Sequence, residues 1–201
     1  MIFGVVIANI LGFFLFLYLY WKRLKEDYPA EKIFNSGFIL SISVFLGMFI
    51  SKIFPNIYWF WIIVFIILIF EAINVFKLKI KFFESLDALI ISLLPWLSLF
   101  YLSHSIQDSN LSSFIAFWFC LFLIFLFFLF NNFYRTFNWY KSGKVGFSGL
   151  SVCVIFFGTR SISSIFMKNL VSFAGYYEPF ISATFFVFSF LLLFRLSRIQ
   201  K

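Results

Sequence analysis

One arginine of this chain lies inside a long apolar run, where a charge is costly. Arg160 is the only charged residue between Phe147 and Met167, and it lies roughly 20 Å from Phe147 along a regular helix. A guanidinium near the middle of a bilayer costs about 2.5–3.5 kcal/mol on insertion scales, so such side chains face the protein interior or a water-filled cavity. Arg160 is therefore the first candidate for a binding or catalytic side chain.

The sequence predicts no carboxylate at the depth of this guanidinium. Glu71, Glu84 and Asp87 lie near the opposite ends of their apolar runs, about 10 Å or more away in depth along regular helices. Asp108 and Glu178 lie in connections at the nearer surface and reach inward only if those connections fold into the bundle. We therefore expect a guanidinium that is available to an anionic ligand.

Two roles for Arg160 are open at this point. The planar fork of a guanidinium matches a phosphate group, so the phosphate of a phospholipid is one expected ligand. The alternative is a structural arginine that extends towards the membrane surface and bonds backbone carbonyls or stacks on Phe156 or Tyr101.

The other polar residues of the apolar runs offer less chemistry. Glu71 and Asn74 are spaced i, i+3, which favours a structural hydrogen bond between helices. His104, the only histidine, lies at the end of an apolar run, where it acts as a base, binds a head group or is simply solvated. Cys120 and Cys153 lie in the middle of apolar runs, so the sequence supports neither a disulfide nor a metal site. Serine and threonine are plentiful, but no nucleophile and base can be paired.

These residues lie on seven apolar runs, each long enough to cross a membrane. A hydrocarbon core of ~30 Å requires ~20 helical residues, and the runs are too continuously apolar for the strands of a membrane barrel. The predicted fold class is all-α, a polytopic bundle of about seven transmembrane helices that forms a single domain over residues 1–201. The predicted spans are Met1–Trp21, Ile33–Ser51, Ile57–Phe76, Phe83–Ser103, Phe114–Phe130, Phe147–Met167 and Phe180–Phe194.

The basic residues predict how this bundle is oriented. Most of them lie in four segments that alternate with nearly uncharged connections. By the positive-inside rule these segments are cytoplasmic, which places the N-terminus outside and the C-terminus in the cytoplasm. The four segments contain Lys22, Arg23, Lys25 and Lys32; Lys77, Lys79 and Lys81; Arg135, Lys141 and Lys144; and Arg195, Arg198 and Lys201.

The composition excludes a soluble monomer. Apolar residues make up 63% of the chain and the mean hydropathy is +1.03, whereas ~45–50% apolar residues are typical of a globular domain. The net charge of +8 comes from cations that flank spans and face an anionic leaflet, which argues against a nucleic-acid partner. The first run lacks a basic segment before it and a small-residue cleavage site, so it is predicted to be an uncleaved span.

Three segments contain motifs of polar, aromatic and glycine residues that apolar helices in general do not share. Phe14–Phe49 contains an apolar helix, a basic turn with Tyr-Pro-x-Glu-Lys, and a second helix with a late glycine. Asn132–Phe166 contains Tyr-Arg-Thr-Phe-x-Trp-Tyr-Lys and then Phe-Gly-Thr-Arg, whose last residue is Arg160. With Phe82–Ala88, which is similar to the start of a fourth family helix, these segments resemble compact members of the prolipoprotein diacylglyceryl transferase family. That family also has seven helices with the N-terminus outside.

The resemblance implies a multi-pass transferase of the plasma membrane that acts in lipoprotein biosynthesis. Such enzymes move the diacylglyceryl group of phosphatidylglycerol onto the lipobox cysteine of a preprolipoprotein, which forms a thioether and releases glycerol phosphate. They need no metal or other cofactor, and their partners are the bilayer, phosphatidylglycerol and the preprolipoprotein signal peptide. In this chain the resemblance makes Arg160 the catalytic residue, which binds the departing phosphate and stabilises developing charge.

The chain departs from the family pattern in three places. Glu71–Lys81 has no His-Gly-Gly block, and Ser164 replaces the acidic residue that follows the arginine. The Gly-Arg-x-Gly-Asn-Phe signature is also absent, and its arginine and asparagine positions fall near Tyr101 and His104. Together with Arg160, these two residues form the predicted substrate-binding set. Three hypotheses follow: a divergent transferase, a catalytically silent relative that binds anionic phospholipid or a lipoprotein precursor, and a small anion channel or transporter unit.

Overall fold

A computed structural model describes residues 2–54, 58–134, 146–167 and 169–198, and between short connections this part of the chain is helical. Seven of its helices are long and apolar enough to cross a membrane. This confirms the predicted all-α, multi-pass fold class. The elements are α1 (Ile2–Leu24), α2 (Ala30–Ser51), α3 (Trp59–Leu78), α4 (Phe82–Asp108), α5 (Leu111–Phe133), α6 (Phe147–Phe166), the 3-10 turn η3 (Gly175–Tyr177) and α7 (Glu178–Arg198).

Several helices extend beyond the predicted spans. Helix α4 continues past Ser103 to Asp108, and α7 begins at Glu178 and ends at Arg198. A helix satisfies its backbone N–H and C=O groups by itself whatever its side chains are, so it can continue beyond the apolar run that defines it in the sequence. The third predicted span starts at Ile57, which lies outside the described residues.

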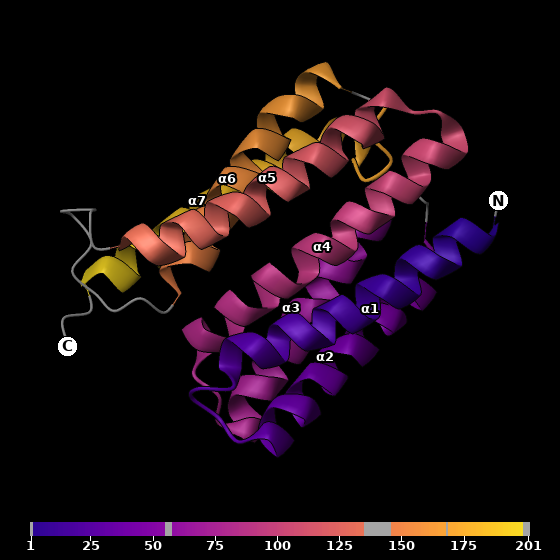
Figure 1. The fold of residues 1–201 in the computed structure, drawn as a ribbon. Coiled ribbons are helices and arrows are strands. Elements are labelled where there is room, and N and C mark those ends of the chain that lie inside the picture. The colour runs from indigo at the N-terminus through magenta and orange to yellow at the C-terminus, as the bar shows by residue number, and fades with distance from the viewer. Residues whose placement is uncertain (1, 55–57, 135–145, 168, 199–201) are drawn as a thin grey trace.

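Helix α4 is the central element of the bundle. It packs against α1 on one side and α5 on the other, while α2 packs on α3 and α6 on α7, so that α1–α4 and α5–α7 form two groups (Figure 1). Every residue from Ser85 to Ser92 is buried, which means that all faces of this stretch of α4 are covered by other helices.

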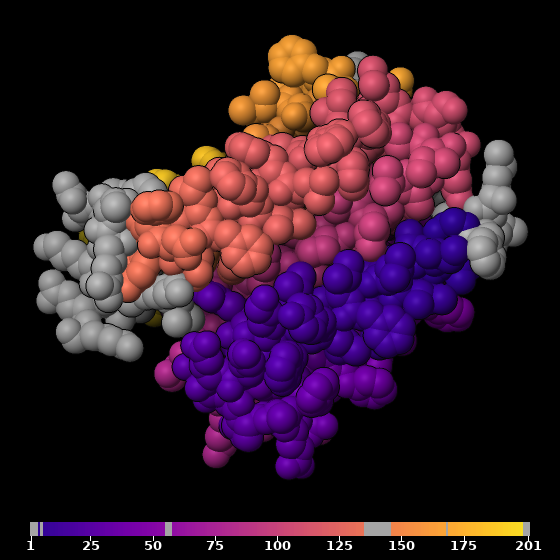
Figure 2. Space-filling view, viewed as in Figure 1, coloured from indigo at the N-terminus to yellow at the C-terminus, as the bar shows by residue number. Residues whose placement is uncertain are grey.

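The outer surface of the bundle is apolar. Helices α1, α2 and α5 dominate the face shown in Figure 2, and large side chains on these helices are well exposed, including Phe14 at 62%, Phe38 at 60% and Phe125 at 60%. A water-soluble monomer rarely exposes apolar area on this scale, whereas the chains of a bilayer solvate it.

Contacts between helix ends show which ends lie together. Asp87 near the start of α4 accepts a hydrogen bond from Arg23 Nε near the end of α1 (2.7 Å) and one from the backbone N–H of Gly149 in the first turn of α6 (2.6 Å). Arg23 Nη1 also donates to Asn131 Oδ1 near the end of α5 (3.0 Å). We call this the basic end of the bundle, and the opposite end, where α4 ends and α7 begins, the distal end. The positive-inside rule predicts that the basic end is cytoplasmic.

Candidate functional site

Arg160 is buried on α6, close to the distal end, with an exposed fraction of 5%. Its Nε donates to Glu178 Oε1 at 2.5 Å, its Nη1 donates to Ser172 Oγ at 2.9 Å, and its Nη2 donates to the backbone carbonyl of Ser172. The expectation that this guanidinium has no carboxylate at its own depth is therefore wrong.

The segment between α6 and α7 explains the difference, because it folds into the bundle. Ser172, Ala174 and Glu178 are completely buried, each with an exposed fraction of 0%. The indole N–H of Trp59 on α3 donates to the carbonyl of Val171 at 2.9 Å. An acidic residue that the sequence places at the membrane surface is thereby carried inward to the arginine.

The carboxylate of Glu178 is hydrogen-bonded by four different groups. Besides Arg160, it accepts from the indole N–H of Trp61 (2.8 Å), the backbone N–H of Ala174 (2.8 Å) and the hydroxyl of Ser182 (2.7 Å). These donors come from α3, α6, α7 and the segment before η3. We call this set the Arg160–Glu178 network. A buried ion pair with its remaining hydrogen bonds made is the arrangement in which burial of two charges is tolerated.

Aromatic rings enclose the guanidinium. Its central carbon lies 3.8 Å from the ring centre of Phe60 and 5.0 Å from that of Phe173, and 5.9 Å from that of Phe156. Such contacts stabilise a desolvated cation by about 2 kcal/mol. The structural alternative for Arg160 predicted that it bonds a backbone carbonyl or stacks on an aromatic ring such as Phe156. The contacts with the Ser172 carbonyl and with Phe156 agree with that alternative.

A cavity adjoins this arginine between α4, α5 and α6. Its volume is about 300 Å³, and we call it the arginine cavity. Hydrocarbon side chains form most of its wall, and the polar residues in the wall are Tyr101, Ser112, Thr159, Arg160 and Ser163. Three of the five N–H groups of a guanidinium are used by Glu178 and Ser172, so a ligand in this cavity would meet an arginine whose charge is already paired.

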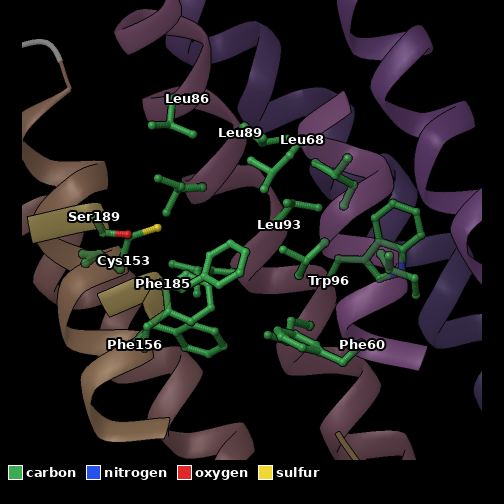
Figure 3. A pocket seen from close by; sticks show the side chains of 18 of the residues that line it. Phe60, Leu68, Leu86, Leu89, Leu93, Trp96, Cys153, Phe156, Phe185 and Ser189 are labelled. Carbon is green, nitrogen blue, oxygen red and sulfur yellow. The ribbon is translucent and has the colours of Figure 1, made fainter. Parts of the chain in front are cut away.

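A second cavity, of about 230 Å³, lies between α3, α4, α6 and α7, and we call it the apolar cavity. Figure 3 shows Cys153, Phe156, Phe185 and Ser189 on one side of it and Leu89, Leu93, Trp96 and Phe60 on the other. None of the described residues that line it is charged. On α4 its wall runs from Phe82 to Phe100, a distance of about 27 Å along a helix and close to the ~30 Å of a hydrocarbon core.

The predicted substrate-binding residues are only partly brought together. The Tyr101 hydroxyl is hydrogen-bonded to Ser172 Oγ at 2.7 Å, so Tyr101 and Arg160 share a partner and both line the arginine cavity. His104 lies one turn further along α4, with Nδ1 3.2 Å from Ser113 Oγ and Nε2 3.0 Å from Asp108 Oδ2. It lines neither cavity, and its role in substrate binding stays a prediction.

Two sets of partners in this structure were not predicted from the sequence. Ser172 and Glu178 were not expected beside the arginine, although a glutamate directly before Pro179 is typical of the first turn of a helix. The pairing of Arg23 with Asp87 was also missed. Its signal is an aspartate inside the fourth apolar run, because such a residue needs a basic or hydrogen-bonding partner on another helix.

No family model, no curated protein and no solved structure matches this chain. The resemblance to diacylglyceryl transferases therefore rests on sequence motifs, and most of the Tyr-Arg-Thr-Phe motif lies in residues 135–145, outside the described residues. Within the described part of the chain, no three His, Cys, Asp or Glu side chains are grouped to hold a metal ion.

Proposed function

We propose that this membrane protein binds a phospholipid, with an acyl chain in the apolar cavity and the head group at the arginine cavity. The observation that carries the proposal is the apolar cavity itself, which is uncharged and follows α4 from Phe82 to Phe100. Phe156 lines both cavities, so the two lie on either side of this side chain, and its movement would join them. The occupant would then lie with its chain inside the bundle and its polar end towards the distal end.

An acyl chain suits the chemistry of the apolar cavity. Its lining is hydrocarbon and aromatic apart from isolated polar groups such as Ser189 and Asn9. The side-chain oxygen of Asn9 already accepts a hydrogen bond of 3.1 Å from the indole N–H of Trp96. A polar solute would lose its hydrogen bonds to water here without replacement, which costs about 1–3 kcal/mol for each group. An acyl chain has no hydrogen bonds to water to lose, so it does not pay this cost.

The head group would be held by hydrogen bonds more than by net charge. Glu178 neutralises Arg160, so the N–H groups that remain and the hydroxyls of Ser112 and Ser163 supply the polar contacts. We therefore expect only a modest preference for phosphatidylglycerol over a zwitterionic phospholipid. This is the catalytically silent, lipid-binding hypothesis derived from the sequence.

Diacylglyceryl transfer to a preprolipoprotein cysteine is the narrower candidate. It is supported by the motif resemblance and by the position of Arg160 in the wall of a cavity. On this hypothesis the protein resides in the plasma membrane, and the phosphate of phosphatidylglycerol binds the Arg160 N–H groups that Glu178 and Ser172 leave unused. The absent His-Gly-Gly block and second arginine make the lipid-binding hypothesis the simpler of the two.

Quenching of tryptophan fluorescence by brominated lipids tests the binding proposal, because Trp59 and Trp96 line the apolar cavity. The background variant carries Trp21→Phe, Trp118→Phe and Trp139→Phe, which leaves the two tryptophans of the cavity wall and Trp61, whose indole is bonded to Glu178. Ser189→Phe fills the cavity, and Leu191→Phe adds similar bulk to a side chain that is 57% exposed on the same helix. We expect Ser189→Phe to lose at least half of the quenching and Leu191→Phe to retain it. Equal quenching in both variants would overturn the proposal.

Depletion of the protein in its native cell tests the transferase candidate. A transferase requires that unmodified preprolipoproteins accumulate, and that Ser163→Leu, which narrows the arginine cavity without removing a member of the Arg160–Glu178 network, fails to restore modification. Ile165→Phe, at a side chain that is 59% exposed on the same helix, is the matched control. Complete modification in depleted cells would exclude the transferase and leave lipid binding in place.

A further inference from the structure

Glu71 on α3 is a buried carboxyl group whose hydrogen-bonding capacity is unused. Its exposed fraction is 1%, and that of Asn74, one turn later, is 0%. Among the described residues, Glu71 Oε1, Glu71 Oε2 and Asn74 Oδ1 find no hydrogen-bond partner. All three atoms are acceptors when the carboxyl group is ionised, so three buried acceptor atoms lie here without a donor bonded to them.

The neighbouring helices supply hydroxyl groups here, and no basic side chain of the described residues is paired with Glu71. The Tyr20 hydroxyl on α1 is hydrogen-bonded to Ser36 Oγ on α2 (2.7 Å) and to Ser85 Oγ on α4 (3.0 Å). The Ser85 hydroxyl is close enough to the Glu71 carboxyl group to act on it as a hydrogen-bond donor, although no hydrogen bond of good geometry forms between them in this structure. The charge of Glu71 also acts on the Tyr20 hydroxyl. Asn74 Nδ2 donates to the carbonyl of Ser36 at 3.4 Å.

Arg23, the basic side chain that enters the bundle at its basic end, is bonded to other groups. Arg23 on α1 forms an ion pair with Asp87 on α4 and a hydrogen bond to Asn131 on α5. The other acidic group near the start of α4, Glu84, is bonded to Tyr28 and Lys81. An ionised Glu71 would therefore be a desolvated charge without a counter-ion, which costs several kcal/mol.

One proton on Glu71 supplies a donor to these unpartnered acceptors. A neutral carboxylic acid carries an O–H donor, and residues spaced i, i+3 lie side by side on a helix, so the Glu71 O–H can reach Asn74 Oδ1. We propose that Glu71 is a proton-binding site in the membrane interior, where the bound proton is shared with Asn74 and exchanges through the hydroxyl groups of Ser85, Tyr20 and Ser36.

A proton fits this place better than a metal cation does. A cation needs an internal space and several oxygen ligands at once, and Glu71 lines neither the arginine cavity nor the apolar cavity. The hydroxyl groups of Tyr20, Ser36 and Ser85 are already bonded to one another. A proton requires no additional volume.

Infrared spectroscopy of the full-length protein in phosphatidylcholine vesicles at neutral pH tests the proposal. A protonated carboxyl group has a C=O stretching band that an ionised carboxylate lacks. We expect this band in the wild type and in Glu26→Gln, whose altered side chain is exposed, and its loss in Glu71→Gln. The band should also shift on transfer to deuterium oxide, because its proton exchanges. A spectrum that Glu71→Gln leaves unchanged would overturn the proposal.

Thermal unfolding separates the proton from a cation and shows that the variants fold. Glu71→Gln mimics the neutral acid, so its unfolding midpoint should match that of the wild type within a few degrees. Asp87→Asn is the contrasting variant, because that carboxylate holds Arg23, and its midpoint should fall clearly. A midpoint that rises with sodium, lithium or potassium chloride in the wild type but not in Glu71→Gln would identify a cation site and refute proton binding.

Discussion

Replacing Glu178 by glutamine tests whether the Arg160–Glu178 network holds the distal end together. The glutamine side chain would keep the shape and one acceptor oxygen of the glutamate but would remove its charge. Arg160 is 5% exposed, so its guanidinium would remain buried without a counter-ion. Breaking a buried ion pair from one side costs about 3–5 kcal/mol, which corresponds to roughly two to four orders of magnitude in the unfolding equilibrium.

The rest of the network increases the expected effect. The Glu178 carboxylate also accepts hydrogen bonds from Trp61, Ala174 and Ser182, and bonds to a charged acceptor are roughly twice as strong as those to a neutral one. A glutamine amide must also present N–H donors to groups that are themselves donors. We therefore expect Glu178→Gln to lie towards the upper part of that range.

Reversible unfolding in mixed detergent micelles measures the effect. The wild type, Glu178→Gln, Arg160→Gln and the double variant form a double-mutant cycle, in which the double variant should recover part of the lost stability because it leaves no unpaired charge. Glu26→Gln is the control, since its exposed side chain should change stability by less than about 0.5 kcal/mol. A Glu178→Gln variant within about 1 kcal/mol of the wild type would refute the argument that this pair is desolvated.

Two further predictions concern the basic end. Gly149→Ala should destabilise the fold by about 1–3 kcal/mol in the same unfolding assay, because a Cβ there would lie 2.7 Å from Asp87 Oδ1. Gly4→Ala, where the added Cβ would meet no described atom outside its own stretch of helix within 4 Å, should have little effect, and equal losses would contradict the packing argument. Burial first, and the hydrogen bond to Glu84 second, raise the pKa of Tyr28. Its contribution to stability is therefore complete below about pH 10 and decreases as the pH rises further. The unfolding midpoints of wild type and Tyr28→Phe should therefore converge as the pH rises above about 10, and a constant difference would contradict the assigned contact.

The seven helices could be predicted because a membrane imposes one rule on every span. A run such as Phe114–Phe130 has no polar residue apart from the thiol of Cys120, and only a helix satisfies its backbone inside hydrocarbon. The ends of helices were predicted less well. Ser103–Asp108 is polar enough to leave the membrane, yet it continues α4, because the choice between helix and loop at a surface depends on local packing and not on hydropathy.

Arg160 was identified from its sequence position because a charge within an apolar run must be satisfied somewhere. Its partners were not identified, since Ser172 and Glu178 belong to a segment whose composition fits the membrane surface equally well. The same holds for Asp87, whose partners Arg23 and Gly149 lie on α1 and α6. Hydropathy and helical spacing reveal which side chains need a partner, but they carry no information about which helices are neighbours.

The amino-acid order therefore determined the number of spans, the distribution of basic residues between the two ends and the positions of costly polar groups, because each depends on the transfer of single residues or runs between water and hydrocarbon. Tertiary packing alone decided that the segment before α7 enters the bundle, that Glu178 neutralises Arg160, and that Glu71 remains without a donor. Those outcomes depend on which surfaces of separate helices come into contact, and a periodic pattern along one helix does not encode that choice.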